Sequence, residues 1–313
     1  MNKLISISFS LLLPLLFTGC IKDNYSKCPS DSESNVILHF QCSESDALIT
    51  QFTDYISSVD LMIYNQQGEL CKQKTVDSKA LNEFQGVSLS LSPGAYKVVS
   101  WANVDEGIQI EDENSTNNPY ITYSSIDSDK RVLSIDSVYY AQEVNARNFS
   151  IPNALELVVP RAGPLEQNLF FRPAHRQLSI YIKGYTENSQ SVLPNIGIEG
   201  LPAALHLFDM NPIIKLGEVE ALQKTKEVLI SNESYAATQV TSFWFEIDHT
   251  IKINIYSPLT GELIYTIPLH EALEIAKARG ASYNRKLEIF IGFIQGEIEI
   301  NVPDWNSGDV NWS

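Results

Sequence analysis

The chain has 313 residues, with 38 acidic and 22 basic side chains, and its formal net charge is −16 at pH 7. The phosphate backbones of DNA and RNA repel such a chain, so the charge argues against a nucleic-acid-binding protein. Beyond the N-terminus no stretch approaches the length of apolar sequence that a membrane-spanning helix needs, which argues against a second membrane element.

The first 19 residues have the pattern of an export signal. Lys3 supplies a short basic region, and residues 4–17 form a compact apolar run that is too short to span a membrane. Cys20 comes directly after two small residues, which is typical of bacterial lipoproteins. We therefore predict a lipoprotein signal peptide over residues 1–19 and lipidation of the Cys20 thiol, by acyl chains that hold the protein to a membrane. The alternative is an ordinary secretory signal followed by a chance cysteine.

A polar tether and a series of short strands are predicted next. Residues 20–34 are rich in serine and aspartate and favour a flexible tether. From residue 35 onward, short apolar runs, some strictly alternating with polar residues, predict β-strands. In the first half of the chain these strands are predicted at residues 35–41, 55–64, 69–74, 87–91, 95–102, 120–124 and 155–159. The rest of the acidic, turn-rich stretch 105–129 is expected to be loop.

The second half repeats this pattern and adds one helix. Its strands are predicted at residues 177–183, 192–201, 240–247, 251–256, 262–267, 287–293 and 297–302. Residues 268–280 predict a helix, because proline stands at the start, apolar residues share one face and glycine follows the end. Many short strands with little helix favour an all-β fold of two transthyretin-like, Greek-key β-sandwich domains in tandem. We place the domains at residues 35–165 and 166–313.

No pattern in the sequence indicates catalysis or a cofactor. None of the five histidines is spaced as a metal pair, and the glycine-rich, nucleophile and zinc motifs of common enzymes are absent. We therefore expect no enzyme, no cofactor, no metal and no small-molecule substrate. A calcium site among the acidic residues 105–113 is the alternative to a solvated loop there, although their spacing is not that of an EF-hand. Cys42 and Cys71 are candidates for a disulfide between neighbouring strands, which the sequence alone does not decide.

The segment 92–103, with the sequence SPGAYKVVSWAN, carries a family resemblance. Its characteristic residues are Pro93, Gly94, Tyr96, Trp101 and Asn103. The segment resembles one in the first domain of the FimB-type fimbrial anchor lipoproteins, anchor subunits of fimbriae in Bacteroides-like Gram-negative bacteria. Other short motifs resemble the same family in the same order: Cys20 and Cys28 around the tether, then residues 171–182, 195–202 and 303–305.

The physical chemistry of residues 92–103 is independent of this resemblance. Proline followed by glycine favours a turn, and the residues after it alternate between the two faces of a strand. Tyr96 and Val98 share one face, whereas Val99 and Trp101 share the other. Core packing is therefore the simplest role for Tyr96 and Trp101.

The resemblance implies a role at the base of a fimbrium. Family members hold the fimbrium to the outer membrane and terminate its growth, so the implied partners are the shaft pilin and the membrane. Lys22 and Asp23 resemble the export signal of surface lipoproteins, which implies that the protein faces the cell exterior. Related pilins polymerise by β-strand exchange after an arginine-directed protease removes their first strand. The first arginine here is Arg131, so we expect the chain to keep its first strand, residues 35–42, and to act as an anchor.

We place the contact with the pilin in the C-terminal segment 288–313, which contains two strand-length runs and the tryptophans Trp305 and Trp312. The alternative for Trp305 is packing against its own domain. Two other functions stay open: a fimbrial tip or accessory subunit, and a surface glycan-binding lipoprotein. The glycan-binding function would need an exposed aromatic platform, for which the candidates are Tyr120, Tyr123, Tyr139 and Tyr140.

Overall fold

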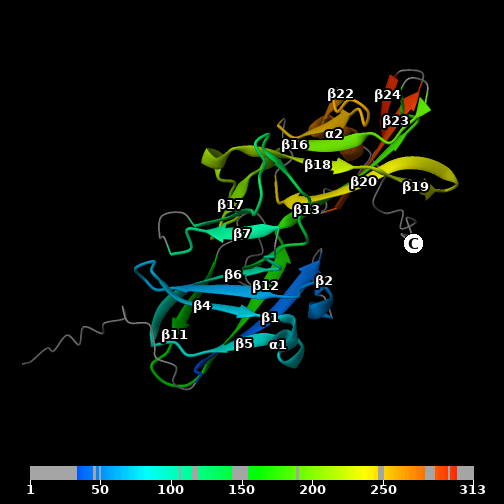
Figure 1. Ribbon diagram of the computed structural model, residues 1–313. Coiled ribbons are helices and arrows are strands. Elements are labelled where there is room, and N and C mark those ends of the chain that lie inside the picture. Colours follow the sequence, from blue (N-terminus) through cyan, green and yellow to red (C-terminus); the bar gives the residue numbers. More distant parts are fainter. Residues whose placement is uncertain are drawn as a thin grey trace, which may run out of the picture.

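The computed structural model describes residues 34–44, 47–48, 51–105, 107–114, 119–142, 154–187, 190–245, 250–278, 286–294 and 297–301. Over these ranges the chain forms many short strands and two short α-helices, so the prediction of an all-β fold with little helix is confirmed. The strands gather in two units, one below the other in Figure 1. No helix among the described residues is long and apolar enough to cross a membrane.

The first unit is a nine-stranded sheet. Its strands follow the order β2–β1–β12–β10–β6–β3–β4, with β5 paired to β1 and β11 paired to β6. Their bounds are β1 Val36–Glu44, β2 Ala47–Leu48, β3 Val59–Tyr64, β4 Leu70–Val76, β5 Gly86–Leu89, β6 Gly94–Ala102, β10 Tyr139–Gln142, β11 Leu155–Val159 and β12 Leu165–Pro173. A short 3-10 helix, η1 (Phe52–Asp54), and the helix α1 (Ser78–Glu83) lie between these strands.

The second unit contains four smaller sheets. Two have five strands, in the orders β19–β20–β13–β23–β24 and β22–β21–β16–β18–β9, and the others are β17–β8–β7 and β14–β15. The bounds are β7 Ile108–Glu111, β8 Tyr120–Tyr123, β9 Arg131–Val132, β13 His175–Lys183, β14 Thr186–Glu187, β15 Gln190–Ser191, β16 Asn195–Pro202, β17 Ala204–His206, β18 Glu218–Lys224, β19 Lys226–Ile230, β20 Glu233–Phe243, β21 Lys252–Tyr256, β22 Leu263–Pro268, β23 Lys286–Ile294 and β24 Glu297–Asn301. The unit also holds η2 (Ile214–Leu216) and the helix α2 (Leu269–Ala278).

Two hydrophobic cores follow from the alternation of side chains along β6. Tyr96 and Val98 belong to the core of the first unit. Val99 and Trp101 point the other way, into a larger core that extends through the second unit. This is the face assignment that the sequence predicts, and it makes β6 the wall between the two cores. The units are therefore joined by continuous apolar packing and not only by the backbone.

The predicted domain division between residues 165 and 166 stays a prediction. The strands of the two units do not change over at that position. β12 pairs with β1 and β10 in the first sheet, so the chain changes sheets at Ala174. Earlier in the chain, β8 pairs with β17, and β9 pairs with β18, so both belong to the second unit. These pairings join residues that are far apart in the sequence, and no local pattern indicates them.

Several predicted elements differ from those observed. The helix α2 lies within the predicted 268–280. The helix α1 and several strands were not predicted, among them β7, β12, β17, β18 and β19. The predicted disulfide candidate is absent, since Cys42 and Cys71 are not joined to each other. The physical reason is distance, because β1 and β4 stand five strands apart along the sheet order.

Candidate functional site

The first strand, β1, lies between two partners in the first sheet. Residues 36–42 pair with residues 165–171 of β12 in parallel, and residues 36–39 pair with residues 86–89 of β5 in antiparallel. The side chains that point into the core are at most 1 % exposed: Val36, Leu38, Phe40 and Cys42. The place of a first strand in the sheet is therefore filled by the chain itself.

Two reciprocal hydrogen-bonded pairs fix β1 along its length. The side-chain amide of Asn35 donates from Nδ2 to the carbonyl of Leu91 at 2.8 Å, and its Oδ1 accepts from the Leu91 N–H at 2.9 Å. Four residues into the strand, Gln85 Nε2 donates to the carbonyl of Phe40 at 2.6 Å, and the Phe40 N–H donates to the Gln85 carbonyl at 3.0 Å. These bonds give hydrogen-bond partners to the backbone N–H and carbonyl groups of Leu91 and Phe40.

Aromatic packing holds β1 from the core side. The ring of Phe40 lies 5.5 Å from that of Phe171 on β12 and 6.1 Å from that of Phe52, and the last two rings are 5.7 Å apart. Such pairs each contribute roughly 0.5–1.5 kcal/mol beyond the area they bury. On the solvent face, His39 Nε2 lies 3.5 Å from a carboxylate oxygen of Glu166, an exposed pair that contributes little.

The motif of residues 92–103 connects the two units. The Trp101 indole is fully buried and its Nε1 donates to the carbonyl of Leu207 at 3.0 Å. Beside it, the Tyr140 hydroxyl donates to the carbonyl of Phe208, and the two rings lie 5.0 Å apart. Tyr96, on the opposite face, donates its hydroxyl to the carbonyl of Ser92 and closes the turn that contains Pro93 and Gly94. The motif is thus structural in this chain.

Asn103 directly follows β6, and its side chain hydrogen-bonds to the backbone of neighbouring segments. Its φ is +58°, in the left-handed region that asparagine tolerates better than most residues. Its Oδ1 accepts from the backbone N–H of Ser57 at 2.8 Å, and its Nδ2 donates to the carbonyls of Tyr55 at 2.8 Å and Ser137 at 2.9 Å. One side chain therefore ties three segments together where the chain leaves the first sheet.

Arg131, the first arginine of the chain, is held in the second unit. Its strand, β9, pairs in parallel with β18, and its Nε lies 3.4 Å from a carboxylate oxygen of Glu220. The Tyr256 hydroxyl and the Asn254 side-chain amide also donate to Glu220, at 2.5 and 3.3 Å. Burial and this hydrogen bond to Glu220 raise the pKa of Tyr256 to about 12. A side chain on Gly197 would overlap the Glu220 carboxylate, so glycine makes room for this network.

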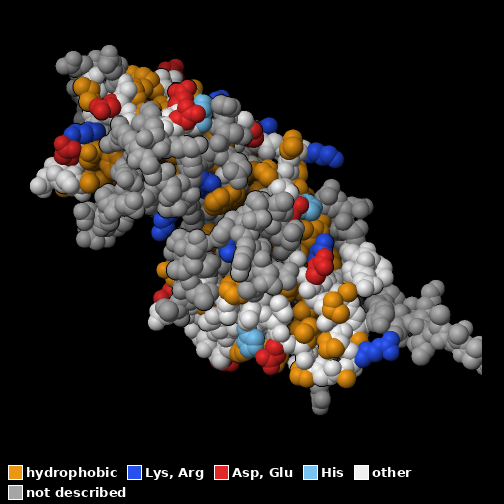
Figure 2. All heavy atoms as spheres, turned by 180° about the vertical axis from the view of Figure 1, so that it is seen from behind, with side chains coloured by type: hydrophobic (Ala, Val, Ile, Leu, Met, Phe, Trp, Pro, Cys, Tyr) orange, Lys and Arg blue, Asp and Glu red, His pale blue; other side chains and the backbone are white. Residues whose placement is uncertain are grey.

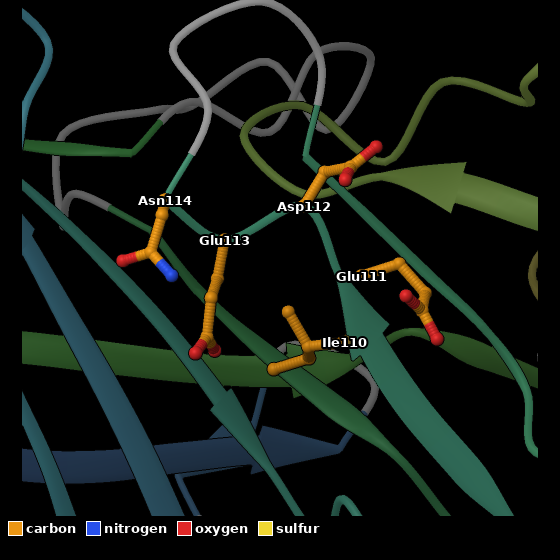
Figure 3. A pocket seen from close by; sticks show the side chains of 5 residues that line it. All are labelled: Ile110, Glu111, Asp112, Glu113 and Asn114. Atoms are coloured by element: carbon orange, nitrogen blue, oxygen red, sulfur yellow. The ribbon is translucent and has the colours of Figure 1, made fainter.

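The acidic stretch that was considered for calcium forms a shallow hollow lined by residues 110–114. Figure 3 shows that the carboxylates of Glu111, Asp112 and Glu113 point in different directions. Glu113 accepts instead from Gln73 Nε2 at 3.1 Å and, through its carbonyl, from the Tyr64 hydroxyl at 3.0 Å. Within the described part of the chain, no three His, Cys, Asp or Glu residues gather as a metal site. The expectation of a loop over residues 105–113 is wrong in part, because residues 108–111 form β7 and Ile108 is buried in the core.

The candidate glycan platform does not form an exposed surface. Tyr123, Tyr139 and Tyr140 are at most 3 % exposed, and only Tyr120 among the four candidates is partly accessible. On the face shown in Figure 2, acidic and basic side chains are interspersed among apolar ones, with no single-sign patch over the described residues. A sugar-binding platform at these tyrosines is therefore wrong for this fold.

Several predicted site residues lie outside the described residues: Cys20, Lys22, Asp23, Cys28, Trp305 and Trp312. Of the predicted pilin contact, the structure describes β23 and β24. β24 forms one edge of its five-stranded sheet, and Ile298 and Ile300 pack partly against the core. Sequence reasoning missed Gln85 and the 207–208 turn, because their partners lie far away along the chain and no local pattern marks them.

The sequence profile of the fimbrillin-A associated anchor proteins Mfa1 and Mfa2 matches residues 25–311. The chain belongs to this family. The predicted resemblance to fimbrial anchor proteins is thereby confirmed, and it covers both units of this fimbrial anchor family member. No protein with a curated description matches its sequence.

Solved structures show the same fold at low sequence identity. The fimbrial anchor protein Mfa2 from Porphyromonas gingivalis superposes with a TM-score of 0.61 at 12% identity, over 86% of this chain and 97% of that one. A candidate adhesin from Bacteroides ovatus gives 0.66 at 14%, over 87% and 94%. A candidate polysaccharide-binding protein from Bacteroides thetaiotaomicron gives 0.65 at 12%, over 87% and 97%. At these identities the likeness concerns the fold alone.

Proposed function

We propose that this member of the fimbrial anchor family is an outer-membrane lipoprotein, lipidated at Cys20 and facing the cell exterior, that holds a fimbrium at its base. The observation that best supports this anchor role is the position of β1 in the first sheet. A subunit that accepts a strand from a neighbour needs an open groove in its sheet. Here residues 36–42 occupy a place in the sheet: they pair with β12 along their whole length and with β5 over residues 36–39, and every second side chain, from Val36 to Cys42, is buried. A subunit with its own strand in place ends a chain of strand exchange and does not extend it.

The position of the first arginine supports the same role. Arginine-directed processing would have to cut before Arg131 to release β1, and the sequence offers no arginine there. Arg131 itself lies in a strand pair with β18 and beside Glu220. Cleavage needs an extended, accessible backbone, so this pairing disfavours cutting at that site as well. The chain then keeps β1, and with it the N-terminal tether.

The C-terminal segment 288–313 is our proposal for the contact with the shaft pilin. Its described part ends in β24, whose outer side has no partner strand among the described residues. An edge strand offers unpaired backbone N–H and carbonyl groups to a further strand. Deleting residues 303–313 should leave the fold intact, as judged by its thermal transition, and release the fimbriae from cells. Retained fimbriae on cells that display the shortened protein would contradict this contact.

A matched pair of cysteine substitutions tests the anchor role. Replacing the chromosomal copy with Cys20→Ala removes the proposed lipid attachment, and we expect fimbriae to be shed into the medium. Cys28→Ala changes a second cysteine of the same N-terminal region and should leave fimbriae on the cells. Fimbriae that stay cell-bound in the Cys20→Ala strain, while the protein is soluble, would contradict an anchor held by lipid.

The glycan-binding alternative keeps one supporting observation, the fold shared with a candidate polysaccharide-binding protein. A pull-down of the mature protein on insoluble polysaccharide separates the two functions. The anchor function predicts no retention on polysaccharide and capture of pilin from a membrane extract. Retention on polysaccharide without pilin would support the alternative.

A further inference from the structure

Every backbone connection between the two units leaves the first sheet at the same end. Tyr139 at the start of β10 pairs with Ala102 at the end of β6 and with Pro173 at the end of β12. At these three neighbouring positions β6 leads into β7, β10 follows β9, and β12 leads into β13. The strands β7, β9 and β13 all belong to the second unit. A force that pulls on the second unit therefore loads β6, β10 and β12 at the same end and in the same direction. It does not shear these three strands against one another.

The proposed membrane tether attaches to the opposite end of this sheet. β1 begins at Val36, which pairs with Leu165 at the start of the parallel strand β12. Figure 1 shows β1 and β12 rising side by side toward the second unit, with β12 continuing into β13. The residues before Val36 therefore leave from the end of the sheet that is distal to the second unit.

From this topology we propose that the β1–β12 ladder is a shear clamp between the membrane and the fimbrium. The inference rests on the proposed function, because only an anchored protein under tension is pulled at these two places. Force on the tether draws β1 out along its own axis in one direction, while force on the second unit draws β12 in the other. The hydrogen bonds of the ladder lie across this axis, so the bonds of all seven paired positions must break nearly together.

Three further features oppose the sliding of β1. β5 flanks it on its other side, so two ladders must give way. Gly86 brings the backbone of β5 so close that an added Cβ would lie 2.4 Å from the Leu38 carbonyl oxygen. Phe40 would have to leave its contacts with Phe52 and Phe171. The same ladder pulled open from one end would break one pair at a time, and most of this resistance would be lost.

Single-molecule pulling tests the clamp by loading one ladder in two directions. The mature chain from residue 20 carries one handle at its N-terminus, and the second handle is a clickable amino acid at one of two exposed positions. At position 259, in the turn between β21 and β22 of the second unit, the ladder is loaded in shear. At position 162, in the turn before β12, the same ladder is loaded from one end. Thermal unfolding of both labelled proteins first shows that the labels leave the fold intact.

We expect the rupture force to be several-fold higher for the handle at position 259 than for the handle at position 162, at the same pulling speed. Equal forces, or a lower force at position 259, would overturn the clamp. The experiment needs neither lipid nor fimbriae, so this failure would leave the anchor role standing. Conversely, cell-bound fimbriae in the Cys20→Ala strain would remove the anchor role and leave a measured difference in force unchanged.

Discussion

The indole N–H of Trp101 reaches from β6 to the carbonyl of Leu207, at 3.0 Å, and joins the first sheet to a turn of the second unit. Both groups are buried, so the bond is shielded from water. Tyr140 makes a parallel bond to the next residue of that turn, Phe208. The two units are thereby fixed to each other at the place where three strands of the first sheet lead into the second unit.

Replacing Trp101 with phenylalanine should lower the free energy of unfolding by roughly 1–3 kcal/mol from the unsatisfied Leu207 carbonyl, before any loss of packing volume. Urea denaturation measures this change. Leu259→Ala, at a side chain that is 64% exposed, is the control and should alter stability by less than about 0.5 kcal/mol. An unchanged midpoint for Trp101→Phe would mean that the bond between the units is dispensable.

Two substitutions of Asn103 should lower the stability of the protein by different amounts. Asn103→Gly loses the side-chain hydrogen bonds but fits the positive φ, whereas Asn103→Ala loses the bonds and also strains the backbone by about 1–2 kcal/mol. We expect stability to fall in the order wild type, glycine variant, alanine variant, as measured by chemical denaturation. Alanine equal to or better than glycine would show that the left-handed conformation is not retained.

A substitution at Gly86 directly tests how closely β5 packs against β1. An alanine Cβ would lie 2.4 Å from the backbone carbonyl oxygen of Leu38, too close to accommodate without moving β5 away from β1, whereas the exposed ring of Phe84 can turn aside. We expect Gly86→Ala to lower the melting temperature and to speed hydrogen exchange in residues 36–42. Gly292→Ala is the matched control, because its Cβ would have only ordinary contacts, with nearest atoms at 3.9 Å. Equal effects of the two substitutions would contradict close packing of β5 on β1.

Alkaline pH should unfold the protein through tyrosines whose pKa values are raised in the folded state. Burial, followed by the hydrogen bond to Glu220, raises the pKa of Tyr256 to about 12, and burial with the charge of Asp209 also raises that of Tyr140. An unfolded tyrosine ionises near pH 10, so stability is fully present below about pH 10 and falls as the pH rises through the raised values. Phenolate absorbance and circular dichroism, recorded together, should show unfolding above pH 10. Full phenol ionisation near pH 10 in a folded protein would contradict this.

Much of the fold could be predicted from the sequence because its signals are local. The alternation in residues 95–102 correctly separates Tyr96 from Trp101, and the proline at residue 268 helps to place α2. The pairing of β9 with β18, and the Asn35–Leu91 and Gln85–Phe40 bonds, could not be predicted. They join residues from distant parts of the chain, and single-sequence patterns carry no information on such contacts. For the candidate site, the first strand was placed correctly, but its partner strand β12 and the side-chain hydrogen bonds that hold it were not predicted.

An anchor role requires the mature protein to keep both its lipid and its first strand. Mass spectrometry of the protein purified with fimbriae from outer membranes, under mild detergent, tests it most directly. We predict an acylated N-terminal peptide that begins at Cys20, together with intact peptides that cover residues 36–44. An unmodified N-terminus, or a mature chain that begins after residue 44, would contradict the account.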